Sequence, residues 1–176
     1  ALPISTSTAA IYCNDPVEPD ANGYIIRGTG SATIAGVFIG CKYLSTSQKR
    51  TVWSSYWPGS DATGDVEAYV IDDPNARFVV QTSTTAFPMT GSATTMTSGV
   101  IGQYAQFTIG TGNSSTGRSG AYLSAVGTTV TYPFTIVDYQ IGVNNGGDPT
   151  SQYCNVIVGF NNEIFRSNGA GPTGIS

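Results

Sequence analysis

The sequence contains no histidine. Histidine is the commonest general base and the commonest metal ligand in proteins, and Ser–His and Cys–His nucleophile pairs depend on it. Its absence excludes those arrangements and leaves carboxylate-pair hydrolases as the enzyme class to weigh. We therefore predict that the chain is not an enzyme and that it has no cofactor.

Charged residues are also scarce, because they make up 10% of the chain against about 25% in typical soluble domains. The net charge is −4, and the basic residues are spread out, with Lys49-Arg50 as the only adjacent pair. Phosphate recognition needs clustered positive charge, so we predict no nucleic-acid partner. A hydrated but nearly uncharged surface is typical of proteins that work outside a cell or on the outside of an assembly.

Long apolar runs are missing as well. No stretch of about 18 apolar residues occurs, and the start of the chain lacks the basic and apolar regions of a signal peptide, so we predict no membrane association. Cys13, Cys41 and Cys154 are too far apart in the sequence for a metal motif. We predict three buried thiols in a reducing compartment, with one disulfide and one free thiol as the alternative.

What the sequence has instead is the pattern of an all-β protein. Val, Ile, Thr, Tyr and Phe dominate, and Gly or Pro interrupts the chain about every ten residues. The expected strands lie in residues 24–28, 32–44, 49–57, 65–71, 77–83, 100–110, 119–126, 132–143 and 153–165. This spacing predicts an antiparallel β-sandwich or jelly-roll-like barrel of about eight to nine strands.

The first residues differ from the rest, because three prolines interrupt any regular structure there. We predict an extended N-terminal arm over residues 1–22 and a single β-sandwich domain over residues 23–176. The arm carries apolar residues that a neighbouring subunit or the edge of the sheet would hold, namely Leu2, Ile4, Ile11 and Tyr12. The Thr- and Ser-rich segment 82–99 is expected to be a long excursion between strands, and 144–151 a turn.

Two groups of carboxylates invite a chemical interpretation. Asp72, Asp73, Pro74 and Asn75 resemble the start of a calcium site, but they fit a β-turn better, with Asp73 first, Pro74 second and Asn75 third. The second group is Asp61, Asp65 and Glu67, which contains the two carboxylates that a glycosidase acid–base pair would need. Loop composition around the aspartates and a strand position for Glu67 favour structural roles.

The two tryptophans of the chain lie close together, with Tyr56 between them. In one continuous strand Trp53 and Trp57 share a face, and Pro58 ends the strand. Aromatic faces stack on sugar rings, so a carbohydrate site is one hypothesis. Tryptophan and tyrosine are also enriched in cores and protein interfaces, and this is the interpretation we favour.

The same region resembles a known family. The ordered pattern consists of Gly40, Cys41, Tyr43, Tyr56, Trp57, Pro58, Val66, Ala68, Tyr69, Val70, Asp72, Asp73, Pro74, Phe78, Val80 and Gln81. It is similar to that of small all-β proteins encoded near the major capsid protein in tailed bacteriophages, and it covers roughly residues 24–81. The resemblance implies a capsid decoration, or cement, protein.

Such proteins bind the outer surface of a mature head, often as trimers, and hold neighbouring capsomers together. The resemblance therefore implies the major capsid protein as partner, a homo-oligomer such as a trimer, and a location on the outer surface of the virion. The residues expected to contact the capsid or a sister subunit are Leu2, Ile4, Tyr12, Trp53, Tyr56, Trp57 and Pro58. A carbohydrate-binding adhesin module, a carboxylate-only hydrolase and a shell-forming capsid subunit are the alternatives.

Overall fold

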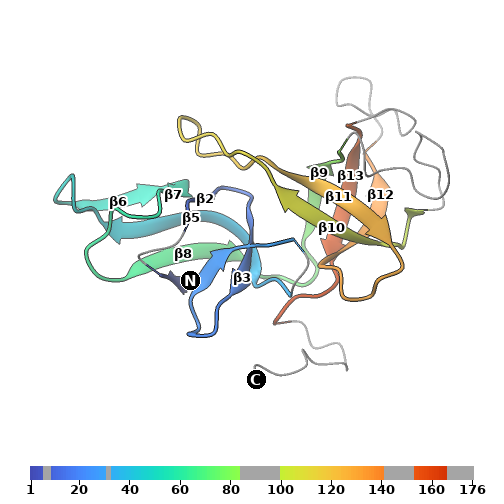
Figure 1. The fold of residues 1–176 in the computed structure, drawn as a ribbon, viewed down its shortest axis with the longest axis horizontal. Coiled ribbons are helices and arrows are strands. Elements are labelled where there is room, and N and C mark those ends of the chain that lie inside the picture. The colour runs from blue at the N-terminus through green and yellow to red at the C-terminus, as the bar shows by residue number, and fades with distance from the viewer. Residues whose placement is uncertain (6–8, 31–32, 84–99, 141–152, 166–176) are drawn as a thin grey trace.

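Figure 1 shows a computed structural model of the chain, which describes residues 1–5, 9–30, 33–83, 100–140 and 153–165. These residues form strands and no α-helix, so the predicted all-β class is confirmed. The strands fall into two lobes that lie side by side along the longest axis of the molecule. We call β1 to β8 the N-terminal lobe and β9 to β13 the C-terminal lobe.

The N-terminal lobe is a small barrel of five strands with three additional strands. It contains β1 (Leu2–Ile4), β2 (Ile11–Tyr12), β3 (Pro16–Pro19), β4 (Ile25–Arg27), β5 (Gly36–Leu44), β6 (Thr51–Ser54), β7 (Tyr56–Trp57) and β8 (Val66–Ile71). One sheet has the order β3-β4-β1-β8-β5-β6, and β3 also pairs with the start of β5, which closes the ring. β6 stays outside the ring as an edge strand beside β5, and β2 pairs with β7.

The segment predicted as an arm is built into this ring. β1 lies between β4 and β8, and Ile4 is opposite both Ile25 and Val66. Ile4, Ile11 and Val17 are buried in the core of the lobe. An extended arm is therefore wrong for this part of the fold, because its apolar residues fill the barrel of the chain itself.

The C-terminal lobe is a curled antiparallel sheet. It contains β9 (Arg77–Gln81), β10 (Tyr104–Ile109), β11 (Ala121–Gly127), β12 (Phe134–Tyr139) and β13 (Asn155–Phe160), in the order β11-β10-β12-β13-β9. Register shifts occur in β10 after Gln106 and in β12 after Ile136, and bulges of this kind bend a sheet. The two outer strands then meet through one parallel bridge between Thr82 and Leu123.

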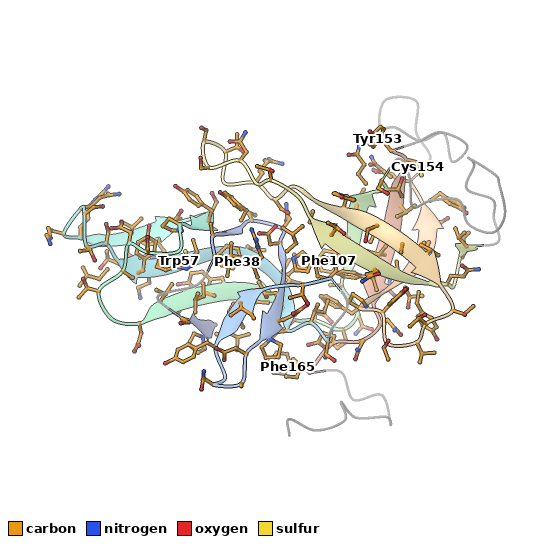
Figure 2. All side chains as sticks on the ribbon, viewed as in Figure 1. Phe38, Trp57, Phe107, Tyr153, Cys154 and Phe165 are labelled. Carbon is orange, nitrogen blue, oxygen red and sulfur yellow. The ribbon has the colours of Figure 1, made fainter. Side chains whose placement is uncertain are left out.

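Each lobe has a hydrophobic core, and Ile34 and Val37 of the N-terminal lobe belong to the core of the C-terminal lobe. In the N-terminal lobe Trp57 packs edge-on against Tyr43, with 5.1 Å between the ring centroids. In the C-terminal lobe Phe134 contacts Phe107 and Phe160, at 5.9 Å in both cases. Figure 2 shows Trp57 inside the N-terminal lobe and Phe107 near the place where the lobes meet. Side chains fill the interior of small barrels in this way.

The lobes are joined by a loop of the C-terminal lobe, residues 110–120, which we call the finger. It extends from the end of β10 toward β2 and β7 (Figure 1). The N–H of Cys13 donates to the carbonyl of Gly117 at 2.8 Å, and the N–H of Ser119 donates to the carbonyl of Cys13 at 2.9 Å. A further bridge pairs Ile34 with Glu163. Backbone hydrogen bonds thus connect the lobes at two places.

The finer parts of the fold prediction are not decided by these pairings. A sandwich or jelly-roll-like barrel of about eight to nine strands stays a prediction, as does a single domain over residues 23–176. The predicted turn at 144–151 and most of the excursion at 82–99 lie outside the described residues.

Candidate interaction surface

Two of the residues predicted to contact a partner lie in the core instead. Trp57 has an exposed fraction of 0% and Ile4 one of 1%. Trp57 belongs to β7, which pairs with β2, and its ring packs on Tyr43. Neither side chain is available to a partner, so the interface prediction is wrong for these two residues.

Trp53 and Trp57 do not share a face, contrary to the prediction from their spacing. The segment is interrupted at Ser55, so that β6 pairs with β5 whereas β7 pairs with β2. The two-residue alternation of side chains holds only within one continuous strand. Trp53, on the edge strand β6, consequently points to solvent with an exposed fraction of 67%.

The sheet register places Trp53 at the end of a row of side chains on the outside of the barrel. Trp53 is opposite Lys42 on β5, Lys42 is opposite Glu67 on β8, and Glu67 is opposite Pro3 on β1. Nζ of Lys42 lies 5.9 Å from the centre of the Trp53 ring and 3.5 Å from Oε2 of Glu67. Exposed contacts of these two kinds contribute about 1 kcal/mol at most, so they orient the indole more than they stabilise the fold.

Apolar side chains flank this row. Leu44 and Ile39 of β5 are both large and exposed, and Tyr69 of β8 is opposite Gly40. We define the Trp53 face as Pro3, Ile39, Lys42, Leu44, Trp53, Glu67 and Tyr69. Exposed apolar side chains gathered on one sheet are a candidate contact surface for another molecule.

Tyr12 and Tyr56 contact each other. Their rings stack with 5.5 Å between centroids and an interplanar angle of 10°, and Tyr12 also lies against Gly112 of the finger. The two tyrosines therefore contribute to the junction between the lobes. Both keep part of their surface exposed, as do Leu2 and Pro58, and contact with a partner stays a prediction for these four residues.

The carboxylates considered as a hydrolytic pair have separate structural partners. Asp61 accepts hydrogen bonds from the hydroxyl of Ser45 at 2.6 Å and from the N–H of Ser47 at 3.0 Å. These bonds, the one from Ser45 foremost, hold the pKa of Asp61 below its usual value. Glu67 takes part in the ion pair described above, and Asp65 is exposed. Asp61 thus fastens two loops together, and Glu67 supports the Trp53 face.

The segment from Asp72 to Asn75 forms a turn between β8 and β9. The carbonyl of Asp73 accepts the N–H of Ala76 at 2.9 Å, and its Oδ1 accepts the N–H of Asn75 at 2.8 Å. Pro74 occupies the second position, where its fixed φ is favourable. Across the described part of the chain, no three His, Cys, Asp or Glu side chains are arranged to hold a metal ion.

None of the three cysteines forms a disulfide. Cys41 and Cys154 are buried, whereas Cys13 is partly exposed next to the finger. Burial raises the pKa of Cys41 to about 12, so that its reactive thiolate is scarce at neutral pH. The buried pair therefore has the character of core residues, and the prediction of a buried thiol does not hold fully for Cys13.

Three buried carboxylates escaped the sequence analysis, Asp15, Glu18 and Glu163, of which Asp15 is the most deeply buried. Asp15, between β2 and β3, has an exposed fraction of 0%; its Oδ2 accepts the N–H of Tyr12 at 2.8 Å, and its Oδ1 has no hydrogen-bond partner. Burial raises its pKa, against the lowering effects of Ser119 and Arg27. No local signal reveals this position, because the finger that adjoins it comes from a distant part of the chain.

Comparison with known proteins adds no relative to this description. No protein-family model matches the chain, and neither the curated proteins nor the solved structures gave a match. Within the described residues, no helix is long and apolar enough to cross a membrane. The functional argument therefore depends on the residues of this chain alone.

Proposed function

We propose that this chain is a structural virion protein that binds the outer surface of a tailed-phage capsid and cements neighbouring capsomers. The observation that carries the proposal is the exposure of Trp53, with 67% of its surface open to solvent on the outside of a closed barrel. The resemblance over residues 24–81 spans β4 to β9, which contain most of the Trp53 face. No catalytic step is needed for such a function.

The Trp53 face has the properties of a contact anchor. Tryptophan is enriched among the few residues that carry most of the binding energy of protein interfaces. Lys42 lies over the ring and is itself paired with Glu67, and these contacts favour one orientation of the ring before any partner binds. Pre-orientation of this kind lowers the entropic cost of association. The face therefore fits a partner with a complementary apolar pocket, such as the surface between capsomers.

The mechanism would be thermodynamic, with the major capsid protein as partner. A protein that binds only the assembled shell stabilises it by mass action. A homo-oligomer such as a trimer would engage several capsomers at once, which raises the avidity without new contacts. The location that follows is the outer surface of the virion, with no contact to nucleic acid or membrane.

The test is binding to expanded phage heads that lack a decoration protein. Complete burial of the exposed two thirds of Trp53 removes roughly 130 Å² from water, which is about 3 kcal/mol at 25 cal/mol per Å². Part of this free energy is offset by the cost of ordering side chains on binding. We therefore expect Trp53→Ala to weaken head binding about 30- to 100-fold. Lys49→Ala, an exposed change outside the face, is the matched control. Absence of co-sedimentation with heads would refute the proposal.

A carbohydrate-binding adhesin module is the second candidate, because the exposed indole has an ammonium beside it and a carboxylate farther along the same row. A sugar ring could stack on Trp53 while its hydroxyls bond to Lys42 and Glu67. A glycan screen, run with and without a chelator, separates the candidates. Saccharide binding that is lost in Trp53→Ala, in a protein that does not bind heads, would favour the adhesin.

A further inference from the structure

We use the word seam for the boundary in the C-terminal lobe along which β9 and β11 face each other. These are the outer strands of the C-terminal sheet; they lie close together, and the backbone bridge that the described residues form between them is the parallel one of Thr82 with Leu123. β9 pairs with β13 on its other side, and β11 pairs with β10. Both strands therefore turn an edge toward the seam.

The hydrogen-bond pattern shows which residues of β9 form this edge. The N–H of Thr82 donates to the carbonyl of Cys154 at 3.0 Å, so Thr82 directs its backbone groups toward β13. Bonded and non-bonded residues alternate along an antiparallel pair. The backbone groups of Arg77, Val79 and Gln81 consequently point toward β11. The N–H of Ser83, which donates to the carbonyl of Leu123 at 3.1 Å, fits the same alternation.

The same alternation shows which residues of β11 face the seam. The N–H of Gly110 donates to the carbonyl of Gly120 at 3.2 Å, which makes Gly120 and Tyr122 the residues of β11 that bond toward β10. Ala121 and Leu123 then face the seam. The N–H of Ala121 is bonded to the hydroxyl of Ser119 at 2.8 Å, which leaves its carbonyl directed at the seam.

A cavity of about 380 Å³ lies in the seam. Every residue of β9 lines it, so the cavity runs along the backbone of that strand rather than beside one face. Apolar residues of other strands also line the cavity, and they come from both lobes, namely Pro16, Val37, Phe107, Ala121, Leu123, Phe134 and Val158. A volume of this size is at the lower end of the range for ligand sites, and barrel mouths are a common place for them.

One charge borders the cavity. Among the described residues that line it, Arg77 is the only ionisable side chain other than the Tyr122 phenol. Nη1 of Arg77 bonds weakly to two backbone carbonyls, those of Asn75 at 3.4 Å and Ala76 at 3.2 Å. The ion pair found in the described residues involves Lys42 and Glu67 and not this arginine. The guanidinium also lies against Gly159 of β13, so its charge is at this end of β9 on the side of β13, and no carboxylate is among the described residues that line the cavity.

We propose that the seam binds an extended peptide segment of a partner protein, which adds as a strand to the edge of β9. The backbone of the segment bonds to Val79 and its neighbours, alternate apolar side chains enter the cavity, and an acidic residue pairs with Arg77. Strand addition to an open edge is a recurrent mode of peptide recognition. Edges that must stay unpaired usually carry lysine, proline or a bulge, and β9 has none of these.

This inference does not depend on the proposed function, because the Trp53 face belongs to the other lobe. Loss of head binding in Trp53→Ala and loss of peptide binding in a seam variant are separate results.

The test removes a single backbone N–H group, that of Val79. Val79→Pro removes an N–H that points to the seam and leaves the hydrogen bonds between β9 and β13 intact, whereas Val79→Thr keeps the N–H and is the matched control. The probes are fluorescent peptides of sequence Asp-Thr-Val-Thr-Val-Thr and its reverse, with lysine in place of aspartate as the charge control. We expect saturable binding to the native chain and to Val79→Thr, at least tenfold weaker binding to Val79→Pro, about two- to fivefold weaker binding to Arg77→Gln, and weaker binding of the lysine peptides.

Hydrogen exchange in the native chain provides a second measurement in case Val79→Pro fails to fold. The amide of Val79 should exchange fast without peptide and become protected when peptide is added, whereas the amide of Val80 should be protected in both states. The inference is overturned by any of three results: no saturable binding up to about 1 mM peptide, equal binding by folded Val79→Pro, or a Val79 amide that is already protected without peptide.

Discussion

Replacement of Trp57 by alanine tests the central assignment of this fold, that this tryptophan belongs to the core and Trp53 to the surface. Trp57 is fully buried and packs edge-on against Tyr43. Truncation of a buried tryptophan to alanine costs about 3–5 kcal/mol, from lost transfer energy and from the cavity that remains. For a chain of this length that corresponds to a decrease of roughly 10 °C in the melting temperature.

The assay is urea denaturation followed by far-UV circular dichroism, with Trp53→Ala as the matched control. That variant loses an exposed ring and one cation–π contact, so we expect a change of about 1 kcal/mol or less. Iodide quenching gives an independent measurement, because the emission of Trp57→Phe should be quenched strongly and that of Trp53→Phe weakly. Similar destabilisation by the two alanine variants, or the reverse quenching pattern, would refute the assignment.

Two further predictions concern titrating groups. Burial raises the pKa of Asp15, so its contribution to folding is favourable below the pKa of the unfolded chain and is lost as the pH rises through the raised folded value. Asp15→Asn should therefore make the protein more stable at pH 7. It should also reduce the loss of stability that the native protein shows as the pH rises above about 4. The measurement is the melting temperature as a function of pH, and a variant that is less stable at pH 7 would contradict the prediction. Cys41, with a pKa raised to about 12, should resist a thiol reagent at pH 8 in the native state, while the partly exposed Cys13 reacts first; mass spectrometry after limited labelling identifies the site.

The strands were predictable because their signals are local. Each of the nine segments expected to be strands contains at least one in the structure, from β4 at Ile25–Arg27 to β13 at Asn155–Phe160, and residues 49–57 contain two. Alternation of apolar residues and the Gly and Pro residues that bound them can be recognised within a few positions. The turn at Asp73 follows from the same local chemistry, since its partners are two and three residues away.

Long-range pairing was not predictable in this way. β1 has three residues, includes a proline, and pairs with β8 through Ile4 opposite Val66, far along the chain. Nothing next to Ile4 in the sequence indicates that partner, so an arm was the simpler interpretation. The prediction that Trp57 lies at an interface was wrong for a similar reason. The interruption at Ser55 separates two strands, and these strands pair with different neighbours.

The two proposed contact sites belong to different lobes, and this bears on how a small protein could act as a cement. Trp53 is on β6 of the N-terminal lobe, and Val79 is on β9 of the C-terminal lobe. The bonds of Cys13 with the finger and the bridge of Ile34 with Glu163 connect the lobes, so that binding at one site holds the other near its partner. Linked sites gain affinity through effective concentration only when the geometry lets both engage at once. A partner that presents an apolar pocket and an extended segment on adjacent subunits would satisfy that condition, whereas the two sites on separate molecules would each bind weakly.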